Sequence, residues 1–175
     1  MKYLEPMLLF HNTGHGFENV SAKSGPIFSQ PLAARGMALG DFNNDGAVDV
    51  LVAVNNAAPV LLRNNVGAEN HWLGLRLIGR KANIDAIGAK VSYQAGDLKR
   101  HLYKVGGGSY LSSHDPRMVL GIGKRTKIDW IEIKWPAPST LVERIADVPI
   151  DRYVTIVEGQ GVRATESNPP SGATK

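Results

Sequence analysis

The sequence predicts an all-β protein, and three observations lead to that class. Short apolar or alternating runs are separated by Gly, Asn, Asp and Pro along the chain, as expected of strands and turns. No window shows a sustained apolar period of about 3.6 residues with capping signals, so we expect little helix. A loop rich in Asp and Asn, Asp41–Asp49, leads directly into the β-branched segment Val48–Val54, which is typical of a turn that opens a strand.

Composition excludes several classes of protein. Of the 175 residues, 43% are hydrophobic and 21% are charged, as in ordinary soluble domains, which argues against wholesale disorder. The chain has no cysteine, which excludes disulfides, thiolate zinc sites and cysteine nucleophiles but leaves the cellular compartment open. No apolar run approaches the roughly 20 residues that span a membrane, and Met1–Gly14 lacks the continuous apolar region of a signal peptide.

The charge pattern argues against a nucleic-acid partner. The formal net charge is +4, but the Lys and Arg residues are scattered along the sequence instead of running together. A groove for nucleic acid needs cations clustered on one face, with aromatic side chains that stack on bases. Scattered cations are more typical of a solvated surface, and we expect no nucleic-acid partner.

Strands are expected where apolar or alternating runs lie between turn residues. The clearest alternation is DWIEIKW, which places Trp130, Glu132 and Lys134 on one face of a half-buried strand and the two isoleucines with Trp135 on the other. Apolar neighbours favour core packing of Trp72, Trp130 and Trp135 over an exposed platform for stacking sugars. In chain order, we predict strands at Met7–His11, Val48–Val54, Val60–Arg63, Trp72–Ile78, Ala89–Gln94, Leu102–Val105, Val119–Leu120, Ile128–Trp135, Val142–Ile145 and Tyr153–Val157.

The Asp-rich loop has the spacing of a cation-binding loop. Oxygen-bearing side chains stand at its positions 1, 3, 5 and 9, and Gly46 stands at position 6, where a sharp turn is needed. Alternate side chains of a tightly wound loop converge on one centre, and hard oxygen ligands suit Ca²⁺. The candidate metal ligands are Asp41, Asn43, Asp45 and Asp49, together with the main-chain carbonyl of Ala47.

The same loop has two other interpretations. An EF-hand needs Glu at position 12 and helical flanks, but position 12 is Val52 and the following segment is β-branched, so the EF-hand is excluded. The second interpretation is an Asx-rich turn without metal, because Asp, Asn and Gly are common turn residues. The demanding spacing favours the metal site, while the turn without metal stays open.

An internal repeat flanks the loop. The heptapeptide LLFHNTG at Leu8–Gly14 recurs as LLRNNVG at Leu61–Gly67, a spacing that suggests propeller blades or solenoid units. The stretch ARGMALGDFNNDGAVDVLVAVNNAAPVLLRNN resembles the FG-GAP/VCBS-type repeat of β-propellers, in which such a loop binds Ca²⁺ between strands of a blade. On that resemblance residues 1–68 form an incomplete propeller region, and the missing blades come from a longer chain or from a partner. An open propeller would leave sheet edges unpaired.

The remainder of the chain resembles a second family. The motifs LRLIGRKANIDAIGAKVSY, VGGGSYLSSHDPRMVLGIG and IDWIEIKWPAP resemble, in order and spacing, the ASPIC/UnbV domain that follows FG-GAP/VCBS repeats. After a boundary at Asn64–Asn70, we expect an ASPIC/UnbV-like, β-sandwich-like domain at residues 69–158 and a flexible tail at 159–175. The resemblance implies no catalytic activity, and it implies an extracellular, periplasmic or otherwise exported protein with calcium-binding and adhesive roles.

Other chemistry in this second unit is weaker. The stretch KVGGGSYLSSHD lacks the order of a phosphate-binding loop, so a β-turn or bulge is favoured. The polar patch Tyr110–Asp115 contains His and Ser, but neighbouring strand residues point to opposite faces and no oxyanion site is indicated. The five histidines lack zinc spacing. We therefore expect a non-enzymatic, calcium-binding interaction or adhesion module, with a protein or glycan partner. The alternative is a carbohydrate-binding or carbohydrate-processing protein that uses Tyr110–Asp115.

Overall fold

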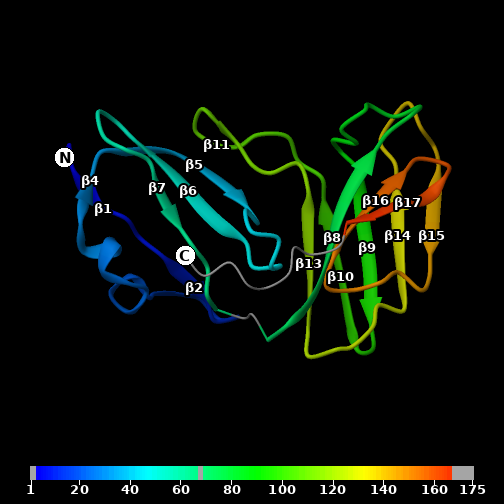
Figure 1. The fold of residues 1–175 in the computed structure, drawn as a ribbon, viewed down its shortest axis with the longest axis horizontal. Helices are drawn as coiled ribbons and strands as arrows, with labels where there is room; N and C mark the ends of the chain where they lie inside the picture. Colours follow the sequence, from blue (N-terminus) through cyan, green and yellow to red (C-terminus); the bar gives the residue numbers. More distant parts are fainter. Residues whose placement is uncertain (1–2, 67–68, 167–175) are drawn as a thin grey trace.

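The computed structural model describes residues 3–66 and 69–166 and divides them into two parts that lie side by side (Figure 1). The all-β prediction is confirmed, because the described residues form strands and two short 3-10 turns, η1 (Ser21–Lys23) and η2 (Pro26–Ser29). Within these residues there is no helix with the length and apolarity that crossing a membrane requires. The parts are called here the N-terminal part, residues 3–66, and the C-terminal domain, residues 69–166.

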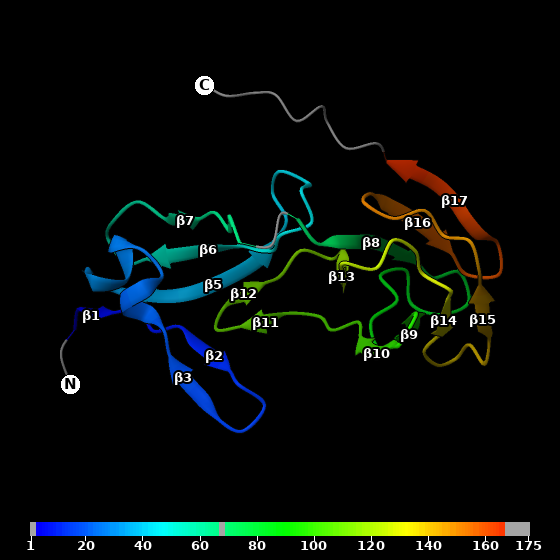
Figure 2. The same cartoon turned by 90° about the horizontal axis from the view of Figure 1, so that it is seen from below.

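The C-terminal domain is built from two four-stranded sheets that face each other (Figure 2). Strand β8 (His71–Ile78) pairs with β16 (Tyr153–Val157) in parallel, whereas the other neighbouring strands of the two sheets are antiparallel. Sheet one contains, in spatial order, β13 (Met118–Gly123), β8 (His71–Ile78), β16 (Tyr153–Val157) and β17 (Gly161–Glu166). Sheet two contains β10 (Leu98–Tyr103), β9 (Lys90–Ala95), β14 (Trp130–Lys134) and β15 (Val142–Ile145).

The hydrophobic core lies between these two sheets. Strands β9 and β14 alternate as their sequences predict, with one face buried and the other partly open to solvent. Burying a large aliphatic or aromatic side chain contributes about 1.5–3 kcal/mol, so this cluster dominates the stability of the domain. Its fully buried members include Leu73, Leu75, Val91, Tyr93, Leu120, Ile131, Ile133, Val154 and Ile156, with Trp135 2% exposed.

A buried carboxylate closes one end of the core. Glu158 directly follows β16 and is 5% exposed, and its Oε2 accepts the backbone N–H groups of Arg80, Lys81 and Ala82 at 2.7–2.9 Å. Burial acts to raise the pKa of this carboxyl, but hydrogen bonds from Ser139 and from the three backbone groups outweigh it and lower the pKa to about 2. Glu158 is therefore ionised at neutral pH and holds the turn that follows β8.

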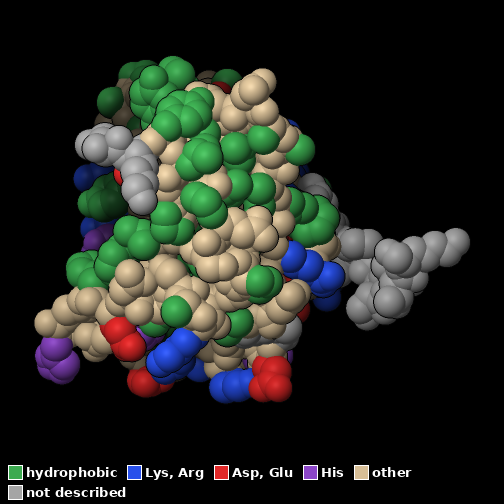
Figure 3. Space-filling model, turned by 90° about the vertical axis from the view of Figure 1, so that its left-hand side faces the viewer, with side chains coloured by type: hydrophobic (Ala, Val, Ile, Leu, Met, Phe, Trp, Pro, Cys, Tyr) green, Lys and Arg blue, Asp and Glu red, His purple; other side chains and the backbone are tan. Residues whose placement is uncertain are grey.

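The N-terminal part has smaller sheets and almost no closed core. Strands β5 (Ala34–Gly40), β6 (Asp49–Val54) and β7 (Val60–Leu62) form a three-stranded antiparallel sheet. Among the described residues of the N-terminal part, the only buried apolar side chains are Ala33 and Val52. Figure 3, which views this end of the molecule, shows many hydrophobic side chains gathered on the surface. The remaining strands are β1 (Glu5–Pro6) paired with β4 (Pro31–Leu32), and β2 (Phe10–Asn12) paired with β3 (Phe17–Asn19).

Several expectations need correction. A three-stranded sheet with two small strand pairs is observed, and propeller blades are not shown. Strand β5 was absent from the predicted strands because its sequence, ARGMALG, lacks a β-branched residue. Trp72 and Trp135 are buried as predicted, but Trp130 lies on the outer face of sheet two and is only partly buried. The predicted tail contains strand β17, which pairs with β16, while residues 167–175 lie outside the described residues.

Candidate functional site

The Asp-rich loop connects β5 to β6 and lies against sheet one of the C-terminal domain. Its path requires backbone angles that most residues avoid, with φ of 57° at Asn44 and 86° at Gly46. Gly46 also lies directly over the indole of Trp72, where an added Cβ would come within 2.3 Å of ring atoms. Glycine at position 6 therefore serves both the turn and the contact between the two parts.

Asp41 is the centre around which this loop folds. Its side chain is 1% exposed, and its Oδ1 accepts the Asp45 backbone N–H at 3.0 Å. Its Oδ2 accepts the Gly46 backbone N–H at 2.8 Å and the hydroxyl of Tyr153 at 2.8 Å. Burial, followed by the hydrogen bond to Asp41 and its negative charge, raises the pKa of Tyr153 well above its ordinary value, so the hydroxyl stays a donor.

The two other carboxylates of the loop also accept backbone donors. Asp49 is 2% exposed, and its oxygens accept the N–H groups of Phe42 at 3.2 Å and Asn64 at 2.7 Å. Asp45 is more exposed; it accepts the Ala47 N–H at 2.9 Å and the side-chain amide of Asn43 at 2.7 Å. Part of the negative charge of the loop is thus balanced by N–H groups that the loop itself supplies.

One oxygen at a predicted ligand position has no partner. Oδ1 of Asn43, at position 3 of the loop, is buried and accepts no hydrogen bond. Buried polar oxygens are nearly always paired, and an unpaired one calls for an explanation such as a bound ion. Among the described residues, no three His, Cys, Asp or Glu side chains gather as a metal site would require. A cation here would therefore depend on the Asn43 oxygen and main-chain carbonyls as well as carboxylates, and such hard oxygen donors suit Ca²⁺.

Arg117 immediately precedes β13 and fastens the loop to the C-terminal domain. Its guanidinium donates to the Asn44 side-chain oxygen at 2.7 Å and to the Asp41 carbonyl at 3.0 Å, and it lies 4.1 Å over the ring of Tyr153. Asp115 holds the same guanidinium through Nε and Nη2 at 2.7–3.1 Å. The hydrogen bond to Asp115 raises the pKa of Arg117, while burial opposes it. Burial acts to raise the pKa of Asp115, but the bonds from Arg117 lower it below its ordinary value.

Strand β8 supplies the surface on which the loop rests. Leu73 and Leu75 point into the core, so the residues between and before them, Gly74 and Trp72, lie on the opposite face of sheet one. The ring of Tyr153 covers Gly74, where a Cβ would come within 2.1 Å of the ring, and contacts Trp72 edge to face at 5.1 Å. The glycine makes room for the tyrosine that binds Asp41.

The predicted polar patch Tyr110–Asp115 forms a second contact between the parts. It belongs to a hairpin of β11 (Gly108–Ser109) and β12 (Ser112–Ser113) that reaches toward β5 (Figure 1). The Leu39 N–H on the edge of β5 donates to Nδ1 of His114 at 3.3 Å, and the Leu39 carbonyl accepts the Asp115 N–H at 2.8 Å. The hydroxyls of Ser112 and Ser113 donate to main-chain carbonyls of Tyr110 and His114. The patch thus covers a sheet edge, and its serines are not paired with the imidazole.

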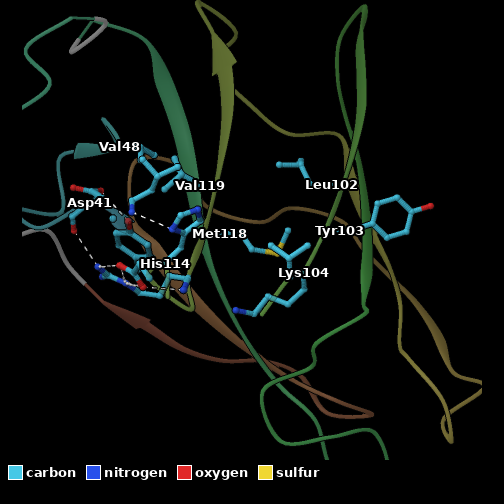
Figure 4. Close-up of a pocket in the computed structure, with 14 residues that line it drawn as sticks. Asp41, Val48, Leu102, Tyr103, Lys104, His114, Met118 and Val119 are labelled. Carbon is cyan, nitrogen blue, oxygen red and sulfur yellow. Dashed lines mark hydrogen bonds and ion pairs between the residues drawn. The ribbon is translucent and has the colours of Figure 1, made fainter. Parts of the chain in front are cut away.

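A cavity lies between the two parts beside this contact (Figure 4). Asp41 and Val48 line it from the loop, and Met118 and Val119 line it from β13. Lys104 is 6% exposed and donates from Nζ to the Pro116 carbonyl. Burial lowers the pKa of Lys104, against the opposing effect of nearby carboxylates. Local spacing did not identify Arg117 or Tyr153, because the loop residues that they contact, Asn44 and Asp41, lie more than 70 residues away in the chain.

These features define an all-β protein whose Asp-rich loop is clamped onto a two-sheet domain. Residues 79–163 match the family model described as ASPIC and UnbV, so they form an ASPIC/UnbV domain. In an alignment of 126 residues, which covers 69% of this chain, the sequence is 31% identical to cartilage acidic protein 1 of Xenopus tropicalis. The chain spans 19% of the length of that protein, so the similarity is distant and partial. Strand β8 precedes the matched residues although it is an inner strand of sheet one.

Proposed function

We propose that the chain is a calcium-binding, non-enzymatic interaction module in which Ca²⁺ bound by the Asp-rich loop fastens the N-terminal part to the ASPIC/UnbV domain. The observation that carries the proposal is the buried, unpartnered Oδ1 of Asn43 at position 3 of the loop. The ligands would be Asp41, Asn43, Asp45 and Asp49 with the Ala47 carbonyl, a hard oxygen set of the kind that Ca²⁺ prefers.

The charge of the loop supports a cation. Asp41 and Asp49 are almost fully buried, and desolvated carboxylates need compensation. Backbone N–H groups supply part of it, and Arg117 reaches the Asp41 carbonyl rather than its carboxylate. Oδ1 of Asp41 and both carboxylate oxygens of Asp49 accept one hydrogen bond each, so each keeps a second lone pair that can bind a cation.

A structural consequence follows from the position of Asp41. Its carboxylate accepts the Tyr153 hydroxyl, so the loop and sheet one share this side chain. An ion that orders the loop would then stabilise the contact with the ASPIC/UnbV domain by mass action, about 2.7 kcal/mol when its free concentration is 100 times Kd. The role of the ion would be structural support of a binding surface.

Titration of the intact chain with Ca²⁺ tests the proposal. Millimolar Ca²⁺ should raise the melting temperature of the wild type, and Asn43→Ala and Asp45→Asn should lose most of that rise. In chelator, Asn43→Ala loses the hydrogen bond from its amide to the partly exposed Asp45 and an oxygen that accepts none, so its melting temperature should fall only slightly. Asp97→Asn is the matched control, because Asp97 is exposed and pairs with Arg125 far from the loop. Equal rises in all four proteins, or no rise in any, would refute the site.

Location and partners extend the same proposal. We propose an extracellular or exported protein with a protein or glycan partner, supported by the distant similarity to cartilage acidic protein 1. Further propeller repeats, from a longer chain or a partner, would cover the apolar surface of the N-terminal part. The alternative, carbohydrate processing at Tyr110–Asp115, is less well supported because His114 and Asp115 are engaged with β5.

A further inference from the structure

The outer face of sheet two gathers cations that are scattered in the sequence. Register places Lys99 of β10, Gln94 of β9 and Trp130 of β14 in one row across the sheet. A second row contains His101, Ser92, Glu132 and Arg144, and a third contains Tyr103, Lys90 and Lys134. Figure 2 shows sheet two below sheet one, with no other described element over the outer side of sheet two. The cationic face is defined here by Lys90, Lys99, His101, Trp130, Lys134 and Arg144.

The cations of this face lack carboxylate partners. Among the described residues, no carboxylate lies within ion-pair distance of Lys90, Lys99, Lys134 or Arg144. Three cations elsewhere in the same domain are each paired instead: Lys124 with Glu69, Arg125 with Asp97 and Lys127 with Asp129.

Register sets two like charges opposite each other on this face, and Arg144 stacks on an aromatic ring instead of pairing with a carboxylate. Lys90 and Lys134 stand directly opposite each other on neighbouring strands, and like charges in that position repel. Glu132 stands directly opposite Arg144, yet the guanidinium lies 4.2 Å over the ring of Trp130. A surface that keeps unpaired like charges side by side is suited to a polyanion.

Aromatic rings hold these cations in place. Trp130 carries the guanidinium of Arg144 at 4.2 Å and the ammonium of Lys99 at 5.7 Å from its ring centre, and its Nε1 donates to Gln94 at 3.2 Å. The ring of Tyr103 lies 5.8 Å from the ammonium of Lys90. An arginine stacked on a ring keeps its planar fork of N–H groups oriented for a carboxylate or sulfate group.

We propose that the cationic face binds an anionic polysaccharide, with carboxylate or sulfate groups of the polymer on Lys90, Lys134 and Arg144. Four strands spaced by about 4.8 Å make a surface about 14 Å wide, enough for consecutive sugar units. A single-stranded nucleic acid would need free ring faces on which bases stack. Here Arg144 and Lys99 lie over Trp130, so a glycan fits the face better. The inference does not depend on the calcium loop.

Binding of three defined polymers tests the proposal. Heparin presents sulfate and carboxylate, hyaluronan presents carboxylate alone, and poly-dT is the nucleic-acid arm. The triple variant Lys90→Gln/Lys134→Gln/Arg144→Gln should weaken glycan binding by about ten-fold or more, with a shallower salt dependence, because contacts to a polyanion release counterions. The control Lys124→Gln/Arg125→Gln/Lys127→Gln removes the same charge from paired cations and should change affinity less than about three-fold.

Additional control measurements separate a loss of binding from a loss of folding. Melting temperatures identify any unfolded variant, and the double variant Lys99→Gln/Lys134→Gln, which changes exposed side chains only, should also weaken binding. Glycan binding by the wild type should be the same in chelator and in millimolar Ca²⁺, which separates this face from the calcium loop. Tighter binding of heparin than of hyaluronan would show that the face recognises sulfate groups, and the reverse would show that it recognises carboxylate groups. Equal losses in both triple variants, tighter binding of poly-dT than of either glycan, or binding of neither glycan would overturn the proposal.

Discussion

The two parts of this chain bury their apolar residues in different ways. In the ASPIC/UnbV-containing domain, two sheets close on each other over a continuous core that includes Leu73, Ile133 and Trp135. In the N-terminal part, the sheet β5-β6-β7 leaves Leu51 and Leu61 45% and 48% exposed. Alternating strands build a stable domain only when a second layer covers the apolar face. The N-terminal part gains order from the clamp on its loop more than from a core of its own.

The largest effect is expected in the closed core. Ile133→Ala should lower the free energy of unfolding of the C-terminal domain by about 2–5 kcal/mol, because Ile133 is fully buried and its truncation leaves a cavity. Urea denaturation followed by tryptophan fluorescence measures the change. Ile133→Val, which removes one methyl group, is the matched control and should cost about 0.5–1.5 kcal/mol. A loss below 1 kcal/mol for the alanine variant, on the same estimate, would show that the two sheets do not share this core.

Glu158→Gln should cause the second largest loss of stability, and the size of that loss should depend on pH. The folded pKa of about 2 lies below the ordinary value of 4.5, so the carboxylate contributes stability above pH 4.5. That contribution is lost as pH falls toward 2. The wild type should therefore lose melting temperature between these pH values, whereas the variant should start lower and vary less. Glu69→Gln, which changes an exposed ion pair with Lys124, should keep the wild-type profile.

Tyr153→Phe tests the clamp between the two parts. It removes the hydroxyl that donates to buried Asp41, and leaving such a carboxylate with one donor fewer costs about 1–3 kcal/mol. Hydrogen exchange should accelerate in the loop 41–49 while β9 and β14 stay protected. Tyr110→Phe changes an exposed tyrosine and is the control. Uniform acceleration across both parts would mean that Tyr153 stabilises the whole molecule rather than the contact.

The smallest effect is expected on the open sheet of the N-terminal part. Leu51→Ala should change the free energy of unfolding by less than about 0.5 kcal/mol, because the side chain is 45% exposed. Denaturation at several protein concentrations measures this. A larger loss that grows with concentration would show that another copy of the chain covers this face.

Sequence patterns predicted the local features of both parts. Alternation in DWIEIKW identified the buried face of β14, since side chains of a strand alternate whatever the fold. The spacing of Asp41, Asn43, Asp45 and Asp49 marked the loop, and Gly46 marked its turn. Trp130 was predicted in the core because its neighbours are apolar, but alternation within the same motif places it outside. Local period proved a better guide than local composition.

Only the tertiary structure decided which distant residues meet. Tyr153 reaches Asp41, and Arg117 reaches Asn44, because β16 pairs with β8 and places its first residue under the loop. The cationic face likewise exists because four strands align Lys99, Lys90, Lys134 and Arg144 on one side. Short-range periodicity determines the face on which a side chain lies. The neighbours on that face depend on strand order and register, which are set by packing of the whole core.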